Sequence, residues 1–171
     1  MGVAYRNCVA EFATGVTVVT AEYDGVPAGM TLNSFTSISL HPLLILVSLT
    51  HGARTLHAVR GSGRFAVSIL HRQQQAAAVT FAKRGVPFAA EHVTRDRNGF
   101  LTIPDAAGIL WCRVASIVTA GDHDLVLGEV FDFLHAGGEP LIFHRGTLGG
   151  LQPDTAIPID HPIGLEEGAG W

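Results

Sequence analysis

The chain has 171 residues, a length that fits one domain and allows an ordinary hydrophobic core without disulfides or metals. Hydrophobic residues make up 47% and charged residues only 15%, and the formal net charge is −4. Because no segment is rich in lysine and arginine, the composition argues against nucleic-acid binding. The longest apolar run, 43–47, is too short to cross a membrane, and residues 1–8 do not have the form of a signal peptide, so we expect a cytoplasmic protein.

The first half of the chain predicts a short helix followed by a series of strands. Apolar residues at helical spacing indicate a helix over 4–14 that packs against a core and ends at Gly15. A β-branched run over 15–23 ends at Asp24-Gly25, a pair typical of a hairpin turn. We expect the remaining elements of this half at 27–31, 34–40, 43–49 and 64–70 (strands) and at 55–59 (a short helical turn).

The second half predicts one more helix, a long loop and a pair of long strands. Good helix formers occupy 73–83, and residues 86–102 lose periodicity, which indicates a surface loop and candidate lid with a short strand near residues 92–93. Strands are expected at 109–120, 125–135 and 140–144. Many strands, hairpin connections and few short helices favour a mainly β, antiparallel barrel over a parallel α/β sheet.

Neither cysteines nor histidines form a recognisable metal or redox motif. Cys8 and Cys112 lie about a hundred residues apart, so we expect both to be buried, unpaired thiols. The nine histidines include no HxxxH, HxH or HExxH pair. We therefore predict no metal site, even at the Asp122-His123-Asp124 triplet.

Several short motifs follow one another along the chain: FATGVTVVT at 12–20, GMTLNSFTSISLHP at 29–42, FAVSIL at 65–70, a glutamine at 74 or 75 with Phe81-Ala82, and GDH at 121–123. This ordered set resembles the flavin reductase-like family, which includes the small reductase components of two-component flavin monooxygenases. The resemblance implies a split β-barrel domain over 1–151, usually a homodimer, that binds FMN or FAD and takes hydride from NADH or NADPH. The tail, 152–171, would be mobile or packed on a partner subunit.

The GMTLNSF segment is the part that the resemblance places against the flavin ring. An isoalloxazine needs an apolar slot with a few hydrogen-bonding partners, which backbone amides and small hydroxyl side chains supply without filling the slot. Gly29 permits a close approach. Taken without the resemblance, the segment would be an ordinary strand with solvent-facing hydroxyls. The candidate ring contacts are Met30, Thr31, Leu32, Asn33, Ser34, Thr36 and Ser37, with Ser48, Leu49 and Thr50 from the stretch 48–51.

The flavin phosphate needs local donors in a net-acidic protein. The family commonly has Ser-x-Thr where this chain has Ala53-Arg54-Thr55, which leaves Thr55 as the hydroxyl and makes Arg54 an extra donor. Lys83 or Arg84, at the end of the predicted helix and after Phe81 and Ala82, is the second candidate. Lys83 and Arg84 could equally be solvent-exposed side chains whose only role is a favourable interaction with the C-terminal end of the helix dipole.

His123 is the candidate catalytic residue, because the resemblance places the histidine of Gly-Asp-His near the nicotinamide and the flavin. Hydride transfer depends mainly on aligning two stacked rings, so His123 would orient the nicotinamide or balance protons on the reduced flavin, and Asp122 would hold the imidazole or the turn. A histidine in a hairpin turn is otherwise often simply exposed. His144 and Arg145 are weaker candidates for the nicotinamide pocket.

Three functions follow from these residues. The first is an NAD(P)H:flavin oxidoreductase that hands reduced flavin to a separate monooxygenase. The second is a flavoprotein that keeps its FMN, as an electron carrier or to act on an organic substrate. The third is a non-catalytic flavin-binding module, against which the Gly121-Asp122-His123 motif argues. NADH is favoured over NADPH because the sequence shows no second cluster of arginines for a 2′-phosphate.

Overall fold

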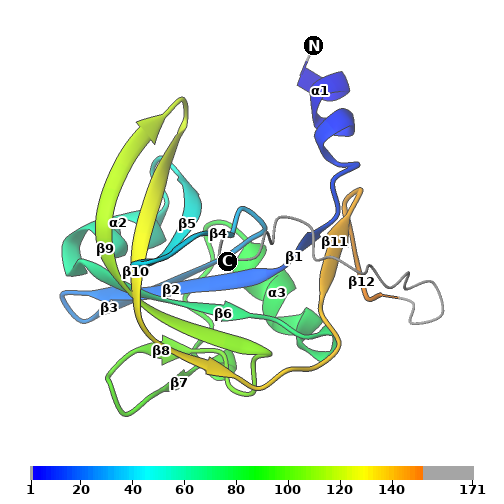
Figure 1. Cartoon of the computed structure of the whole chain (residues 1–171). Coiled ribbons are helices and arrows are strands. Elements are labelled where there is room, and N and C mark those ends of the chain that lie inside the picture. The colour runs from blue at the N-terminus through cyan, green and yellow to red at the C-terminus, as the bar shows by residue number, and fades with distance from the viewer. Residues whose placement is uncertain (1, 152–171) are drawn as a thin grey trace.

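The computed structural model describes residues 2–151 and is built mainly from antiparallel strands (Figure 1). The helices are α1 (Gly2–Val9), α2 (Arg54–Ser62) and α3 (Gln75–Ala82), with short 3₁₀ turns at Arg72–Gln74 and Ala90–His92. The strands are β1 (Thr14–Gly15), β2 (Thr17–Tyr23), β3 (Val26–Leu32), β4 (Thr36–Leu40), β5 (Leu43–Thr50), β6 (Arg64–Ile69), β7 (Thr94–Arg95), β8 (Leu101–Thr102), β9 (Gly108–Ala120), β10 (His123–His135), β11 (Ile142–His144) and β12 (Thr147–Gly149). The predicted tail lies outside the described residues.

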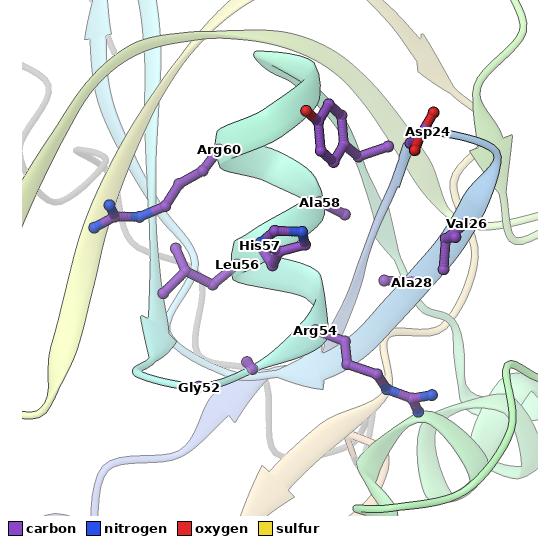
Figure 2. A pocket seen from close by; sticks show the side chains of 11 residues that line it. Asp24, Val26, Ala28, Gly52, Arg54, Leu56, His57, Ala58 and Arg60 are labelled. Carbon is purple, nitrogen blue, oxygen red and sulfur yellow. The ribbon is translucent and has the colours of Figure 1, made fainter.

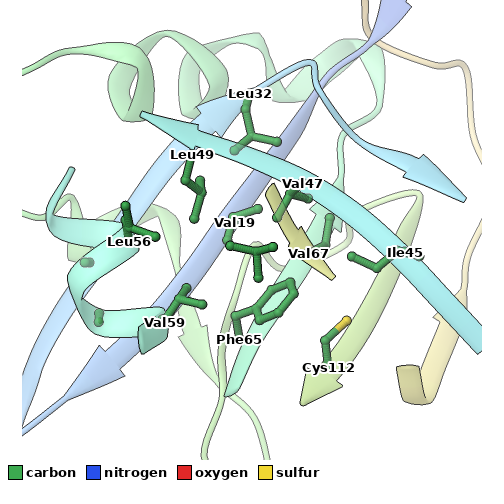
Figure 3. Packing of buried hydrophobic residues seen from close by; sticks show 14 of the residues in the cluster. Val19, Leu32, Ile45, Val47, Leu49, Leu56, Val59, Phe65, Val67 and Cys112 are labelled. Carbon is green, nitrogen blue, oxygen red and sulfur yellow. The ribbon is translucent and has the colours of Figure 1, made fainter. Parts of the chain in front are cut away.

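Seven strands form one antiparallel sheet in the order β3-β2-β6-β9-β10-β5-β4. Strands β3 and β5 stand far apart in this order, yet Leu32 from β3 and Val47 from β5 belong to the same buried cluster. The sheet must therefore curl until its two ends face one core, as Figure 3 shows. This is the predicted split β-barrel, and the predicted mainly β, antiparallel fold is confirmed.

The central strands are buried on both faces, which explains their continuous apolar character. Since side chains alternate along a strand, Val19 and Val67 point into the barrel with Phe65, while Val18 and Ala66 point outward. Helix α2 closes the inner cluster with Leu56 and Val59 (Figure 3). Helix α3 and the 88–106 segment cover the outer cluster.

The N-terminal helix differs from its prediction in both length and packing. It spans Gly2–Val9 rather than 4–14, and it has no buried residue, with Val3 73% and Phe12 beyond it 77% exposed. Helical spacing of apolar residues predicts a helix but does not say against what it packs. The expectation that this helix packs on the chain's own core is wrong, and the expectation that Cys8 is buried is wrong with it.

The 86–102 segment is tied to the barrel by specific contacts. Asp96 accepts hydrogen bonds from the backbone of Asn98 (2.8 Å) and Phe100 (2.9 Å) and from the Trp111 indole, while Thr20 donates to the Leu101 carbonyl. A loop anchored in this way does not stand free as a lid. The strand predicted near 92–93 is displaced to β7, because 90–92 forms a 3₁₀ turn.

The other element boundaries lie close to the predictions, with two differences. Helix α2 runs over the whole of Arg54–Ser62 instead of a single turn, and it ends at Gly63 in the left-handed conformation (φ 66°). The strand expected at 140–144 is the shorter β11, which pairs with an unpredicted β12. Within 2–151, no helix is long and apolar enough to cross a membrane.

Candidate functional site

A cleft of about 500 Å³ opens where three segments distant in sequence meet. Strand β3 supplies 29–31, the end of β5 and the start of α2 supply 50–55, and the end of α3 with its following turn supplies 81–85. The volume falls within the range typical of small-molecule sites, about 300–1,000 Å³. The first and third segments carry parts of the quoted motifs, Gly29-Met30-Thr31 and Phe81-Ala82, and the second carries candidate phosphate donors.

Candidate cofactor residues from all three segments line this cleft, Arg84 among them. Gly29 is needed for the wall between β3 and α3, because a Cβ atom there would lie 2.7 Å from the Phe81 ring. Thr31 donates its hydroxyl proton to the Ala78 carbonyl (2.7 Å), which joins the same two elements. The structure therefore brings together Met30, Thr31, Thr50, Arg54, Thr55, Phe81, Ala82 and Lys83.

Other candidate ring contacts lie outside the lining of the cleft. Leu32 and Leu49 point into the inner core. The Ser34 hydroxyl donates to the Ser48 carbonyl (3.1 Å) and accepts from the Ser48 amide (3.0 Å), so it joins the chain after β3 to β5. This placement gives the side chains of Leu32, Leu49 and Ser34 structural roles, and Ser48 takes part through its backbone. Three more polar candidates sit on the turn after β3 and on β4: Asn33, Thr36 and Ser37.

The start of α2 provides an anion-binding geometry at the cleft. The helix begins at Arg54, and its N-cap residue Ala53 offers no capping side chain, so the first backbone N–H groups are available to a ligand. Thr55 is 2% exposed and lies in this first turn. The Arg54 guanidinium donates to the Val86 carbonyl across the cleft, toward the segment that carries Lys83. The donor set suits a phosphate.

The Gly-Asp-His turn adjoins the cleft through strand pairing. His123 is the partner of Thr50 in the β10–β5 register, and the His51 amide donates to the Asp122 carbonyl (2.9 Å). The His123 Nδ1 lies 2.7 Å from an Asp122 carboxylate oxygen, and this hydrogen bond holds the pKa of Asp122 below its usual value. The turn thus fixes the orientation of the imidazole next to a cleft residue.

A buried carboxylate supports the same edge of the cleft, and it is a residue that the sequence reasoning missed. Asp124 is fully buried and accepts hydrogen bonds from Arg60, from Thr119 Oγ1 (2.9 Å) and from His51 Nε2 (3.1 Å). The Arg60 hydrogen bond, together with those from Thr119 and His51, holds the pKa of Asp124 below its usual value against the effect of burial. The sequence does carry a signal for its position: Asp124 lies two residues before the inward-facing Val126, and alternate residues of a strand point the same way.

His51, which lines the cleft, is therefore held by a buried acid. Its imidazole is partly exposed, with 45% of the side chain accessible, while its partner Asp124 is 1% accessible. One carboxylate oxygen serves His51 and Thr119, and the other serves Arg60. This arrangement fixes which ring nitrogen faces the acid and leaves the opposite edge of the imidazole toward the cleft.

His144 and Arg145 lie in a separate part of the fold, outside the cleft lining. They belong to the β11–β12 hairpin, which pairs with β1. Arg145 forms a bidentate ion pair with Glu11 (2.6–3.0 Å), which raises the pKa of Arg145. Their proposed contact with a nicotinamide stays a prediction.

Among residues 2–151, no group of three or more histidine, cysteine, aspartate and glutamate side chains is placed to hold a metal ion. In the Asp122-His123-Asp124 triplet, the two aspartate side chains point in different directions. The Asp124 side chain points into the barrel, whereas the Asp122 side chain is 91% accessible and bonded to His123. The two carboxylates do not converge.

The fold is that of a split-barrel protein, and its candidate site is the cleft at the junction of β3, α2 and α3. The chain belongs to the flavin reductase-like family, since the family model described as "Flavin reductase like domain" matches residues 9–152. The resemblance noted in the motifs is therefore confirmed over most of the chain.

Individual relatives match this chain over most of its length, and a solved structure among them matches its fold. The reductase component of a 4-nitrophenol 4-monooxygenase/4-nitrocatechol 2-monooxygenase from Rhodococcus opacus is 36% identical, covering 87% of this chain and 80% of that protein. A flavin reductase (NADPH) from Lentzea aerocolonigenes is 38% identical, covering 81% of this chain and 84% of the relative. The structure of the Streptomyces globisporus C-1027 NADH:FAD oxidoreductase SgcE6, in complex with NAD and FAD fragments, is 34% identical with a TM-score of 0.84, covering 91% of this chain and 95% of that one.

Proposed function

We propose that this protein is an NAD(P)H-dependent flavin reductase that passes hydride to FMN or FAD and supplies the reduced flavin to a separate monooxygenase. The observation that carries the proposal is the cleft, which gathers candidate cofactor residues from three distant segments. Membership of the flavin reductase-like family supports it. So does the relative named as a monooxygenase reductase component, which this chain matches over most of both lengths.

The residues of the cleft fit a flavin mononucleotide unit. Met30 and Phe81 provide apolar surface for a ring system, and the backbone at Gly52, where a Cβ atom would meet nothing within 4 Å, allows close approach. The phosphate would lie at the start of α2, where N–H groups, Thr55 and Arg54 converge. When bound, the flavin supplies the hydride-accepting chemistry, and the protein supplies binding and orientation.

The histidines beside the cleft would align the nicotinamide with the flavin. His51, which follows β5 and is held by Asp124, and His123, which begins β10 and is held by Asp122, are fixed by hydrogen bonds before any ligand arrives. Fixed donors need no reorganisation when the rings stack, which favours hydride transfer. We take NADH as the donor and a homodimer as the working assembly, with NADPH as the alternative that the assay below tests.

The test is the oxidation of NADH and of NADPH by the purified protein with no flavin, riboflavin, FMN or FAD added. We expect saturable oxidation that depends on added flavin and falls at least about tenfold in His123→Ala, with flavin binding retained. Absence of oxidation with every pair would overturn the proposal. Oxidation or colour without added flavin would instead indicate a tightly held FMN, and with it the flavoprotein function.

A further inference from the structure

The buried Asp124 holds together four elements beside the cleft. Its carboxylate lies on β10 and accepts hydrogen bonds from Thr119 of β9, from Arg60 of α2 and from His51, which follows β5. Arg60 also belongs to the wall of a second cavity, of about 550 Å³, between α2 and the β2–β3 hairpin, but its guanidinium turns away from the hairpin to reach Asp124 (Figure 2). The proposed function uses the imidazole of His51, and the network behind this imidazole decides which of its nitrogens can meet a ligand.

The protons of this network can be assigned from its donors and acceptors. The hydrogen bond from Arg60, with those from Thr119 and His51, holds the pKa of Asp124 below its usual value, and an ionised carboxylate only accepts hydrogen bonds. Each partner must therefore donate, Thr119 through Oγ1 (2.9 Å) and His51 through Nε2 (3.1 Å). A neutral imidazole has a single N–H, so a proton on Nε2 leaves Nδ1 of His51 as a hydrogen-bond acceptor.

The ring of His51 is held in this orientation. Its backbone amide donates to the Asp122 carbonyl (2.9 Å), so the main chain and the side chain are both tied to the β9–β10 hairpin. A flip of the imidazole would remove a hydrogen bond from a carboxylate that is 1% accessible, where solvent cannot replace it. The imidazole itself lines the cleft, so its acceptor nitrogen is available to a ligand there.

His123 differs from His51 in both respects. Its Nδ1 lies 2.7 Å from an Asp122 oxygen, so the same reasoning places the proton on Nδ1 and leaves Nε2 free. Asp122 is 91% accessible, and a hydrogen bond to an exposed carboxylate competes with water. Of these two imidazoles, His51 is the one whose tautomer is set by a buried charge.

We propose that Asp124 is a positioning residue, which holds His51 with its proton on Nε2 so that Nδ1 accepts a hydrogen bond from the ligand in the cleft. The inference rests on the proposed function for the identity of that ligand. A flavin and a nicotinamide cofactor both carry N–H and O–H donors for such an acceptor, and the experiment separates the two sources. With the other tautomer, an N–H of His51 would face the same donor and the hydrogen bond would be lost.

The first measurement determines the tautomer in the ligand-free protein, by ¹⁵N NMR of labelled histidine side chains at pH 8, above the ordinary imidazole range. His51→Gln identifies the His51 signals by their loss. We expect the proton on Nε2 in the wild type and on Nδ1 in Asp124→Asn, because Arg60 can only donate and keeps the amide oxygen, so the amide nitrogen donates to His51. The matched control, Thr119→Val, removes a hydrogen bond from the same carboxylate oxygen and should leave the proton on Nε2.

The second measurement is the KM for NADH and the KM for the added flavin. Asp124→Asn and His51→Gln should each raise one of these constants about tenfold, and the double variant should show no further rise, since Asp124 acts through His51. The exposed Asp105→Asn, outside the cleft, should leave both within about twofold. A rise confined to NADH assigns the donor to the nicotinamide cofactor, and a rise confined to the flavin assigns it to the flavin. An equal rise in both, no rise in either, or additive losses in the double variant would overturn the inference.

Failure of this inference and failure of the proposed function are distinguishable. If the wild type oxidises no NADH with any flavin, the proposed function has failed, and the NMR spectra alone decide the role of Asp124. A proton on Nδ1 of wild-type His51, or an unchanged tautomer in Asp124→Asn, would overturn the inference whatever the activity. If Asp124→Asn does not fold, the wild type and His51→Gln decide: a proton on Nε2 with a raised KM in His51→Gln supports the inference, and the absence of either overturns it.

Discussion

Asp124 is fully buried, which is unusual for an aspartate. Charged carboxylates are rarely buried without partners, and this one has three. Loss of Arg60, whose own side chain is 53% accessible, would leave this buried carboxylate without its cationic partner, which is costly even where the intact pair contributes little. Since His51 and Arg60 line the two different cavities, the acid couples the geometry of both to the barrel.

The folding stability of the protein should therefore depend on pH, and ionisation of Asp124 should account for part of that dependence. Its folded-state pKa lies below the unfolded value of about 3.9, so the folded carboxylate binds fewer protons. The resulting stability is present above about pH 4 and is lost as the pH falls through the folded-state pKa. We expect Asp124→Asn to lower the Tm at neutral pH and to flatten the decline of Tm from pH 5 to acid, measured by thermal unfolding at stepped pH.

The matched control for this measurement is Asp105→Asn, an exposed aspartate for which asparagine also tolerates the local positive φ of 57°. It should reproduce the wild-type pH profile. If Asp124→Asn shows that same profile with an unchanged Tm, the three hydrogen bonds do not support the folded state.

The two cysteines should differ sharply in reactivity. Burial raises the pKa of Cys112 to about 12, so almost no reactive thiolate forms at pH 8, whereas Cys8 is exposed on α1. A disulfide reagent should titrate about one thiol in the native protein and both after denaturation, read from the released chromophore. Cys8→Ser should leave no fast-reacting thiol. Rapid reaction of both in the native state would contradict the buried placement of Cys112.

At the scale of elements, the absence of a side chain at Gly128 allows β10 of the long β9–β10 hairpin to lie close to Phe65 of β6. A Cβ atom at Gly128 would lie 2.5 Å from the Phe65 ring and 3.1 Å from the Cys112 Cβ, inside the barrel core. We expect Gly128→Ala to lower the free energy of unfolding by about 1–3 kcal/mol, as overpacking of a dense core does. Chemical denaturation measures the change.

Two further variants separate overpacking from a backbone effect. Gly149→Ala, on a strand where a Cβ meets nothing within 4 Å, should change the stability by less than about 0.5 kcal/mol. Adding Phe65→Leu to Gly128→Ala should remove the clash with the ring, so the double variant should lose less than the sum of the two single losses. Strict additivity would mean that the two residues do not compete for the same space.

The elements that could be predicted from sequence are those whose signal is local. β-branched runs bounded by turn pairs predicted β2 and β3 to within two residues, whereas the helical turn predicted at 55–59 stopped short of Ser62 because Gly61 lies inside α2. The alternation with Val126 marks Asp124 as inward-facing, but its partners could not be predicted, because they come from residues 51, 60 and 119 and only the folded sheet brings them together. The short β12 gave no apolar alternation, so its pairing with β11 was equally invisible.

At the scale of the whole molecule, α1 stands apart from the barrel (Figure 1). Its side chains and the segment after it expose Val3 (73%), Tyr5 (68%) and Phe12 (77%). Apolar side chains gathered in this way mark an interaction surface, and the family resemblance points to a second copy of the chain. We predict a homodimer in sedimentation equilibrium, weakened at least about tenfold by Phe12→Glu. A monomer at micromolar concentration would contradict this.

The acidity of the molecule as a whole makes the few cations of the cleft decisive for anion binding. With a net charge of −4, long-range attraction does not bring a flavin phosphate to the protein, so short-range donors must hold it. Arg54→Ala should therefore weaken FMN binding about tenfold and leave riboflavin, which has no phosphate, within about twofold. Fluorescence titration measures both, and the exposed Arg97→Ala, which removes the same charge outside the cleft, should change neither. Equal losses for FMN and riboflavin would show that Arg54 acts on the ring or the fold rather than on the phosphate.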